Sequence, residues 1–123
     1  KEAEQQSLFT EMNDAVTSFV KDLKSNNRLN DVMLFTFSAF GRRVQQNASG
    51  GTDHGTANSM FLISGGLTKK GLLNELPDLS DLDEGDLKYK VDFKDVYATM
   101  LNKWLGANDE AILNKQHAYL DFI

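Results

Sequence analysis

The sequence contains no cysteine in its 123 residues. This absence excludes disulfides, thiolate nucleophiles and cysteine-based zinc sites. Long apolar runs are also missing, so no stretch predicts a helix that crosses a bilayer. Histidine is scarce: the chain has 2, and one of them, His54, lies in a glycine-rich segment.

An excess of positive charge is missing as well. The formal net charge is -5, whereas a general nucleic-acid binder would carry a basic face, so we predict no nucleic-acid partner. Length and composition suit one globular domain. We recognise no signal peptide, and because the first residue is Lys rather than Met we expect a processed or trimmed product.

Two apolar runs organise the chain. Asp31-Val-Met-Leu-Phe-Thr-Phe37 and Met60-Phe-Leu-Ile63 are rich in β-branched and aromatic residues and have the length of strands. Because they are continuously apolar, they favour strands buried on both faces. We predict parallel, adjacent strands at about 31–37 and 60–64, in a sheet covered by helices. The glycine-rich segment 38–56 would follow the first strand's carboxyl end, where α/β proteins bind ligands.

An amphipathic helix is predicted from Ser7 to Lys24, before the first strand. Its apolar stripe, which we expect to pack across the two strands, consists of Leu8, Met12, Val16, Phe19, Val20 and Leu23. A helix that leads into a buried strand is half of a right-handed βαβ unit. The strand that should precede the helix is not found in the chain.

The second half of the chain carries capping signals. Asp92 is the predicted N-cap of a helix that Gly106 closes, and Asn108 is the predicted cap of a last short helix. We expect Trp104 to be largely buried, with its helix docked on the sheet. The apolar tail 118–123 is expected to dock on the core.

Several polar features have ordinary interpretations. The acidic segment Asp78–Asp86 fails as an EF-hand because Gly85 comes one place too early, so we predict a solvated loop. His117 has no paired ligand in the sequence, and we interpret it as structural. Ser38 lacks the Gly-x-Ser-x-Gly context of a nucleophile elbow.

Asp53 and His54 form the first candidate site. In a glycine-rich loop, a neighbouring carboxylate and imidazole can face one divalent ion, and zinc, manganese or iron would suit them. The alternative is a solvated histidine beside an Asx-turn made by Asp53. Arg42 and Arg43 form the second candidate: an arginine there could clamp a phosphate or sulfate, or pair with one of the many acids.

Three motifs, in order, resemble the carboxyl-terminal part of a bacterial exported family, domain-of-unknown-function family fifteen-oh-one. They are Phe37-Ser-Ala-Phe-Gly-Arg42, Gly50-Gly-Thr-Asp-His-Gly55 and Phe61-Leu-Ile-Ser-Gly-Gly66, and the segment 91–106 resembles the family's closing helix. That family is similar to the alkaline phosphatase and sulfatase superfamily. The resemblance implies a three-layer α/β/α sandwich, of which residues 1–123 would form a single carboxyl-terminal portion.

The resemblance also implies site residues. Asp53 and His54 would be metal ligands, in one of two registers against the superfamily, and Arg42 would hold the substrate anion. The implied cofactor is a divalent metal: zinc, manganese or calcium. Where the family has Ser-Glu-Phe-Gly-Arg, this sequence has Ala39 at the Glu position, and alanine cannot ligate a metal. The family's upstream metal motif and nucleophile are not found in the chain.

Two functions follow from this resemblance. The first is an exported sulfatase- or phosphatase-like protein, periplasmic or at the cell surface, whose metal site is incomplete in this chain and which is non-catalytic as it stands. The alternative is a metal-dependent hydrolase of phosphate or sulfate esters when full length. The expected partners are the missing amino-terminal part of the same protein and surface-assembly partners.

Overall fold

A computed structural model describes residues 2–123. The α-helices are α1 (Glu2–Ser25), α2 (Phe93–Thr99) and α3 (Asp109–Leu113), with a 3-10 turn at Leu29–Asp31 and a π-helical turn at Met100–Trp104. The strands are β1 (Leu34–Phe35), β2 (Gly41–Gln46), β3 (Thr52–Gly55), β4 (Leu62–Ile63), β5 (Leu82–Asp83) and β6 (Asp86–Leu87). The described residues thus form a mixed α/β fold with three two-stranded antiparallel sheets.

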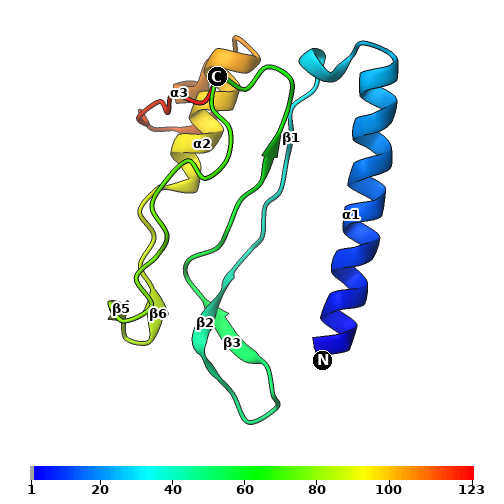
Figure 1. Cartoon of the computed structure of the whole chain (residues 1–123). Coiled ribbons are helices and arrows are strands. Elements are labelled where there is room, and N and C mark those ends of the chain that lie inside the picture. Colours follow the sequence, from blue (N-terminus) through cyan, green and yellow to red (C-terminus); the bar gives the residue numbers. More distant parts are fainter. Residues whose placement is uncertain (1) are drawn as a thin grey trace.

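Residues 34–63 form one long antiparallel ribbon (Figure 1). Its base is the β1–β4 pair, in which Leu34 lies opposite Ile63, and its distal half is the β2–β3 pair. The prediction of parallel strands at 31–37 and 60–64 is therefore wrong, although the two segments are adjacent. A parallel pair needs a crossover of a dozen or more residues, usually a helix, whereas the connecting segment here folds back as a hairpin.

Asn47 organises the turn at the tip of this ribbon. Its Oδ1 accepts hydrogen bonds from the backbone N–H of Ser49 and Gly51, each at 3.1 Å, and from the Ser49 hydroxyl at 2.8 Å. Gly50 takes a φ of 75°, which glycine adopts at little cost. The glycine-rich segment that the sequence suggested as a loop is thus mostly paired strand around a short, tightly bonded turn.

The core lies between α2, its π-helical continuation and the base of the ribbon. Val96, Met100 and Phe122 are buried together, and Met33, next to the ribbon, and Met60 and Leu62 in it pack against them. The tail is bonded here too, since Thr68 donates its backbone N–H to the Phe122 carbonyl at 3.0 Å. The prediction that the tail docks on the core is confirmed.

The predicted caps are confirmed. The Asp92 side chain accepts from the Lys94 N–H at 2.8 Å, and Asn108 accepts from the Ala111 N–H at 3.1 Å. Gly106 has a φ of 63°, the left-handed conformation expected after a helix. Trp104 is partly buried, and most of its surface is covered, as predicted. The acidic segment that we predicted as a loop contains a small hairpin, β5–β6, turned through Glu84 and Gly85.

Helix α1 forms where the amphipathic pattern predicts a helix, but it does not pack as predicted. It is longer than predicted, and none of its residues is buried. Leu8, Met12 and Phe19 remain 61%, 45% and 44% exposed. The prediction that the apolar stripe covers the two strands is wrong for these residues, because α1 stands apart from the ribbon along most of its length (Figure 1). Within residues 2–123, no helix combines the length and hydrophobicity that a bilayer span requires.

Candidate functional site

The β2–β3 hairpin brings Arg42 directly opposite His54. Directly opposed residues share one face of an antiparallel pair, so both side chains lie on the same side of the hairpin. The ring of Phe40 stacks on His54, with centroids 3.7 Å apart, and the Arg42 guanidinium carbon lies 5.5 Å from the Phe40 ring centroid. Phe40, Arg42 and His54 thus form an exposed cation–aromatic cluster.

Arg42 is oriented by one hydrogen bond. Its guanidinium donates to the Thr52 carbonyl at 2.8 Å across the hairpin. Arginine carries five N–H donors, so this bond leaves others facing solvent. Among residues 2–123, Arg42 makes no ion pair, whereas Arg28 pairs with Asp31 and Arg43 pairs with Asp86. Arg42 is therefore the arginine whose charge remains available to an external anion.

Arg43 has a structural role. Its Nε lies 3.1 Å from Oδ1 of Asp86, and the Asp86 side chain is only 18% exposed. The Thr56 hydroxyl also reaches the Leu87 carbonyl, at 3.2 Å. Together these contacts attach the β5–β6 hairpin to the ribbon, and they separate the roles of the two neighbouring arginines.

Asp53 and His54 turn to opposite faces of β3. Successive side chains of a strand alternate in direction, and the contacts follow this rule. Asp53 accepts a hydrogen bond from the Asn47 amide at 2.9 Å, while His54 stacks on Phe40. The pair does not fit one metal ion in this arrangement. Across the described residues 2–123, no three His, Cys, Asp or Glu side chains gather as metal ligands.

Ala39 and Ser38 lie exposed, just before β2. The Ser38 hydroxyl donates to the Phe40 carbonyl at 2.8 Å, so it stabilises a local turn. Ala39 precedes the first ring of the cation–aromatic cluster. An acidic side chain at position 39 would therefore be attached to the residue next to Phe40, beside the cation–aromatic cluster.

The hairpin also borders an open depression. Residues that belong to both faces of the hairpin line it: Arg42, Arg43, Asn47, Thr52, Asp53 and His54. The depression collects guanidinium, amide and hydroxyl groups beside one carboxylate. Such a surface offers hydrogen-bond donors to a small anion, with Asp53 opposing the anion's charge on one side.

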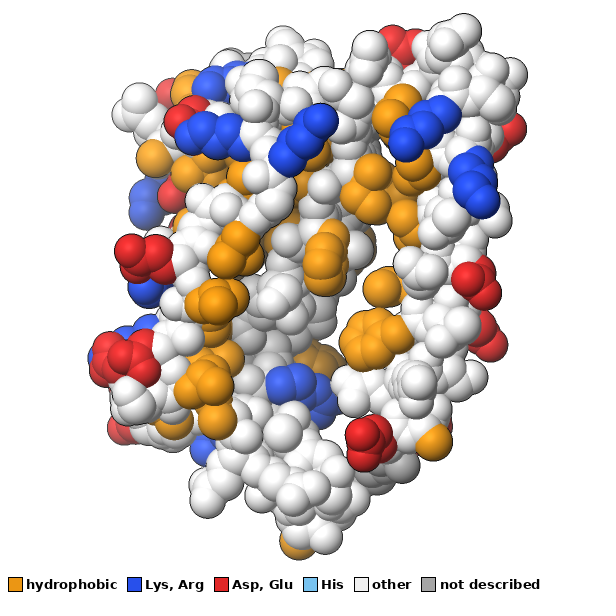
Figure 2. Space-filling model, viewed as in Figure 1, with side chains coloured by type: hydrophobic (Ala, Val, Ile, Leu, Met, Phe, Trp, Pro, Cys, Tyr) orange, Lys and Arg blue, Asp and Glu red, His pale blue; other side chains and the backbone are white. Residues whose placement is uncertain are grey.

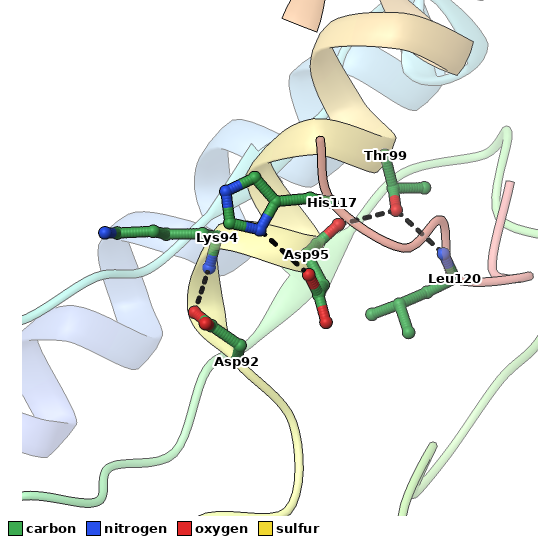
Figure 3. Close-up of polar contacts among 6 residues, drawn as sticks. All are labelled: Asp92, Lys94, Asp95, Thr99, His117 and Leu120. Carbon is green, nitrogen blue, oxygen red and sulfur yellow. Dashed lines mark hydrogen bonds and ion pairs between the residues drawn. The ribbon is translucent and has the colours of Figure 1, made fainter. Parts of the chain in front are cut away.

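A second polar cluster joins α2 to the tail (Figure 3). Nδ1 of His117 lies 3.1 Å from Oδ1 of Asp95, and the His117 side chain is 5% exposed. The Thr99 hydroxyl donates to the Asp95 carbonyl at 2.7 Å and accepts from the Leu120 N–H at 2.9 Å. This arrangement supports the structural interpretation of His117, because its contacts fasten the tail to the core.

A buried carboxylate next to this cluster has no distinguishing pattern in the sequence. Asp109 is 4% exposed, and its Oδ1 accepts from Tyr119 at 2.9 Å and from Asn102 at 3.0 Å. Burial alone would raise the pKa of Asp109, but the hydrogen bonds from Tyr119 and Asn102 outweigh it and hold this pKa below its usual value. Only the tertiary contact with Tyr119 identifies this residue, since an aspartate in the first helical turn is otherwise commonplace.

The fold and site thus define a mixed α/β chain with an exposed cation–aromatic hairpin. It belongs to the family described as protein of unknown function (DUF1501), whose family model matches residues 1–119. No curated protein and no solved structure matches the chain.

Proposed function

We propose that this chain is an anion-binding, non-catalytic portion of an exported phosphatase- or sulfatase-like protein. The observation that carries this proposal is the divergence of Asp53 and His54, one bonded to Asn47 and the other stacked on Phe40. Two ligands that point apart cannot hold a divalent ion against water. In this proposal the chain belongs to a three-layer α/β/α sandwich and works beside an amino-terminal portion of the same protein, in the periplasm or at the cell surface.

Arg42 is the anion-binding residue in this proposal. Two observations support this assignment. Arg42 has no ion-pair partner within residues 2–123, and the hydrogen bond to the Thr52 carbonyl holds its guanidinium in place. A planar guanidinium binds phosphate or sulfate through two parallel N–H bonds. Because the hairpin is open to solvent, we expect weak binding of small dianions.

The alternative function is a metal-dependent hydrolase of phosphate or sulfate esters when full length. The segment Gly50-Gly-Thr-Asp-His-Gly55 favours it, since it retains a carboxylate and an imidazole next to Arg42. One of the two, Asp53 or His54, would then join ligands supplied by another segment. Zinc, manganese or calcium would polarise the ester oxygen in that arrangement.

Calorimetric metal titration tests whether this chain holds a metal site of its own. We expect no tight binding of zinc, manganese or calcium by the unmodified chain. Tight binding that disappears in His54→Ala would overturn the non-catalytic proposal. Binding gained in Ala39→Glu would support it, and would identify position 39 as the ligand position that this chain has lost.

Anion binding is tested by following the β2–β3 amide resonances during titration with inorganic phosphate and with sulfate. We expect shifts at Arg42, Thr52 and His54 that Arg42→Gln abolishes. The matched control is Arg28→Gln, which removes an exposed arginine already paired with Asp31. Equal binding by Arg42→Gln and the unmodified chain would contradict the assignment.

A further inference from the structure

The chain exposes far more surface than a compact protein of its mass. Its accessible surface is 9258 Å². A compact monomer of 13.8 kDa would expose about 6,600 Å² by the usual scaling. The excess is about 2,600 Å² on this chain alone, comparable to one side of the largest obligate interfaces, which bury about 2,000–5,000 Å² or more summed over both partners. An exposed apolar surface of this size indicates that another polypeptide segment packs against it.

Many of the exposed large hydrophobic side chains lie on α1 and on the ribbon. The helix has 24 residues and none is buried, with Leu8 and Phe9 more than half exposed. On the ribbon, Phe37 is 75% and Phe61 is 60% exposed. Figure 2 shows an open gap between the helix and the rest of the chain, with hydrophobic side chains along both sides. This gap, between α1 and residues 34–63, is called the α1–ribbon gap below.

The free backbone of β1 indicates what fits the gap. Within the described residues, β1 pairs with β4 alone, so its other edge has no strand beside it. An unpaired edge is a template for an added strand. Helix α1 precedes β1 in the chain, and a helix in that position covers the sheet when a parallel strand lies before it, in a right-handed crossover.

We infer that the α1–ribbon gap is the docking face for β-strands from a further segment of the same protein, which add to the free edge of β1 beneath α1. This inference rests on the proposed function, because it gives the proposed amino-terminal portion its place. Added strands would bury the stripe of α1 and pair the edge of β1 at once. A second copy that packed helix against helix would leave that edge unpaired.

The chain alone supplies the first test. We expect it to be monomeric by light scattering and to bind the dye ANS, and we expect fast hydrogen exchange in α1, because an exposed helix gains little stability from tertiary packing. A dimer that Phe19→Glu dissociates would overturn the inference, since a second copy would then cover the gap. Slow exchange throughout α1 in a monomer would overturn it too.

The second test adds the proposed amino-terminal portion of the protein as a separate polypeptide. We expect it to slow exchange in α1 and β1 at least tenfold and to suppress ANS binding. Phe19→Glu should abolish both effects. Thr10→Glu, which places the same charge on the polar side of α1, should leave them intact. No protection of α1 and β1, or equal loss in both variants, would overturn the inference.

The two proposals fail separately. Phe19→Glu lies on α1, away from the cation–aromatic cluster, so phosphate titration of the hairpin should be unchanged in this variant. Absence of docking by the unmodified chain, with intact anion shifts, would overturn the inference and leave Arg42 as the anion-binding residue. Absence of anion shifts with intact docking would overturn the assignment of Arg42 as the anion-binding residue and leave the docking inference standing.

Discussion

The phenol of Tyr119 donates a hydrogen bond of 2.9 Å to Oδ1 of Asp109, the buried carboxylate at the start of α3. The same bond raises the pKa of Tyr119, because the nearby carboxylate favours the neutral phenol. Since Asn102 donates to the same oxygen, the bonds join the π-helical turn, α3 and the tail at one atom. The C-terminal unit is therefore held by a polar contact as well as by its apolar core.

Tyr119→Phe should destabilise the chain at neutral pH, and its free energy of unfolding should fall less steeply with acid than that of the unmodified chain. The folded pKa of Asp109 is lowered, so its stabilising contribution is complete above its unfolded value of about 3.9 and is lost as pH falls through the folded pKa. The free-energy difference between the two proteins, from urea unfolding, should therefore shrink below about pH 4. Tyr89→Phe is the control, because Tyr89 is 65% exposed. A difference that stays constant with pH would contradict this linkage.

His117→Ala should lower the free energy of unfolding by about 1–3 kcal/mol, because it removes the hydrogen-bond partner of a part-buried carboxylate. That carboxylate is Asp95, whose Oδ1 lies 3.1 Å from Nδ1 of His117. His54→Ala removes the other histidine, which is exposed, and should change stability by about 0.5 kcal/mol or less. Thermal or urea unfolding of the two variants measures the contrast. Equal effects would show that His117 does not fasten the tail.

Gly106→Val should cost about 1–2 kcal/mol, the penalty of placing a side chain in the left-handed conformation. Nothing lies within 4 Å of the added Cβ, so the effect would come from the backbone φ of 63° alone. Gly51→Val is the matched control, since its Cβ would meet its nearest neighbour at 3.9 Å and its φ is not positive. An unchanged melting temperature for Gly106→Val would rule out this account.

Gly41→Ala should disrupt the ribbon where β2 begins. A Cβ at this position would lie 1.5 Å from the Ala57 carbonyl oxygen, so the backbone must move. We expect a decrease in stability of about 1–3 kcal/mol, typical of overpacking, together with faster hydrogen exchange across β2 and β3. Gly51→Ala lies in the same ribbon without such a clash and should be close to neutral. Undisturbed exchange in Gly41→Ala would show that the close approach is not required.

Local chemistry was predictable for the helices. The N-caps Asp92 and Asn108 and the left-handed Gly106 depend on atoms within a few residues, and all three are confirmed. The ribbon was not predictable in the same way. Apolar runs such as 31–37 and 60–63 predict strands but carry no information about direction, which the hairpin between them decides.

The candidate site was likewise predictable only in part. The sequence placed Arg42, Asp53 and His54 near one another, and the hairpin does bring Arg42 opposite His54. It could not show that Asp53 and His54 turn apart, because that depends on whether residues 52–55 form a strand or a loop. Nor could the sequence reveal the contact between Asp109 and Tyr119, because these residues lie 10 positions apart, a separation that no helix or strand period brings together.

The sequence by itself determined most of α1, the N-caps of α2 and α3, the apolar tail and the absence of thiol chemistry, because each depends on residue type and short spacing. Only the tertiary structure decided the antiparallel ribbon, the separate roles of Arg42 and Arg43, and the exposure of the α1 stripe. The physical reason is that burial and side-chain direction depend on which segments meet in space. A stripe such as Leu8, Met12 and Phe19 specifies that it needs a partner, but not which one.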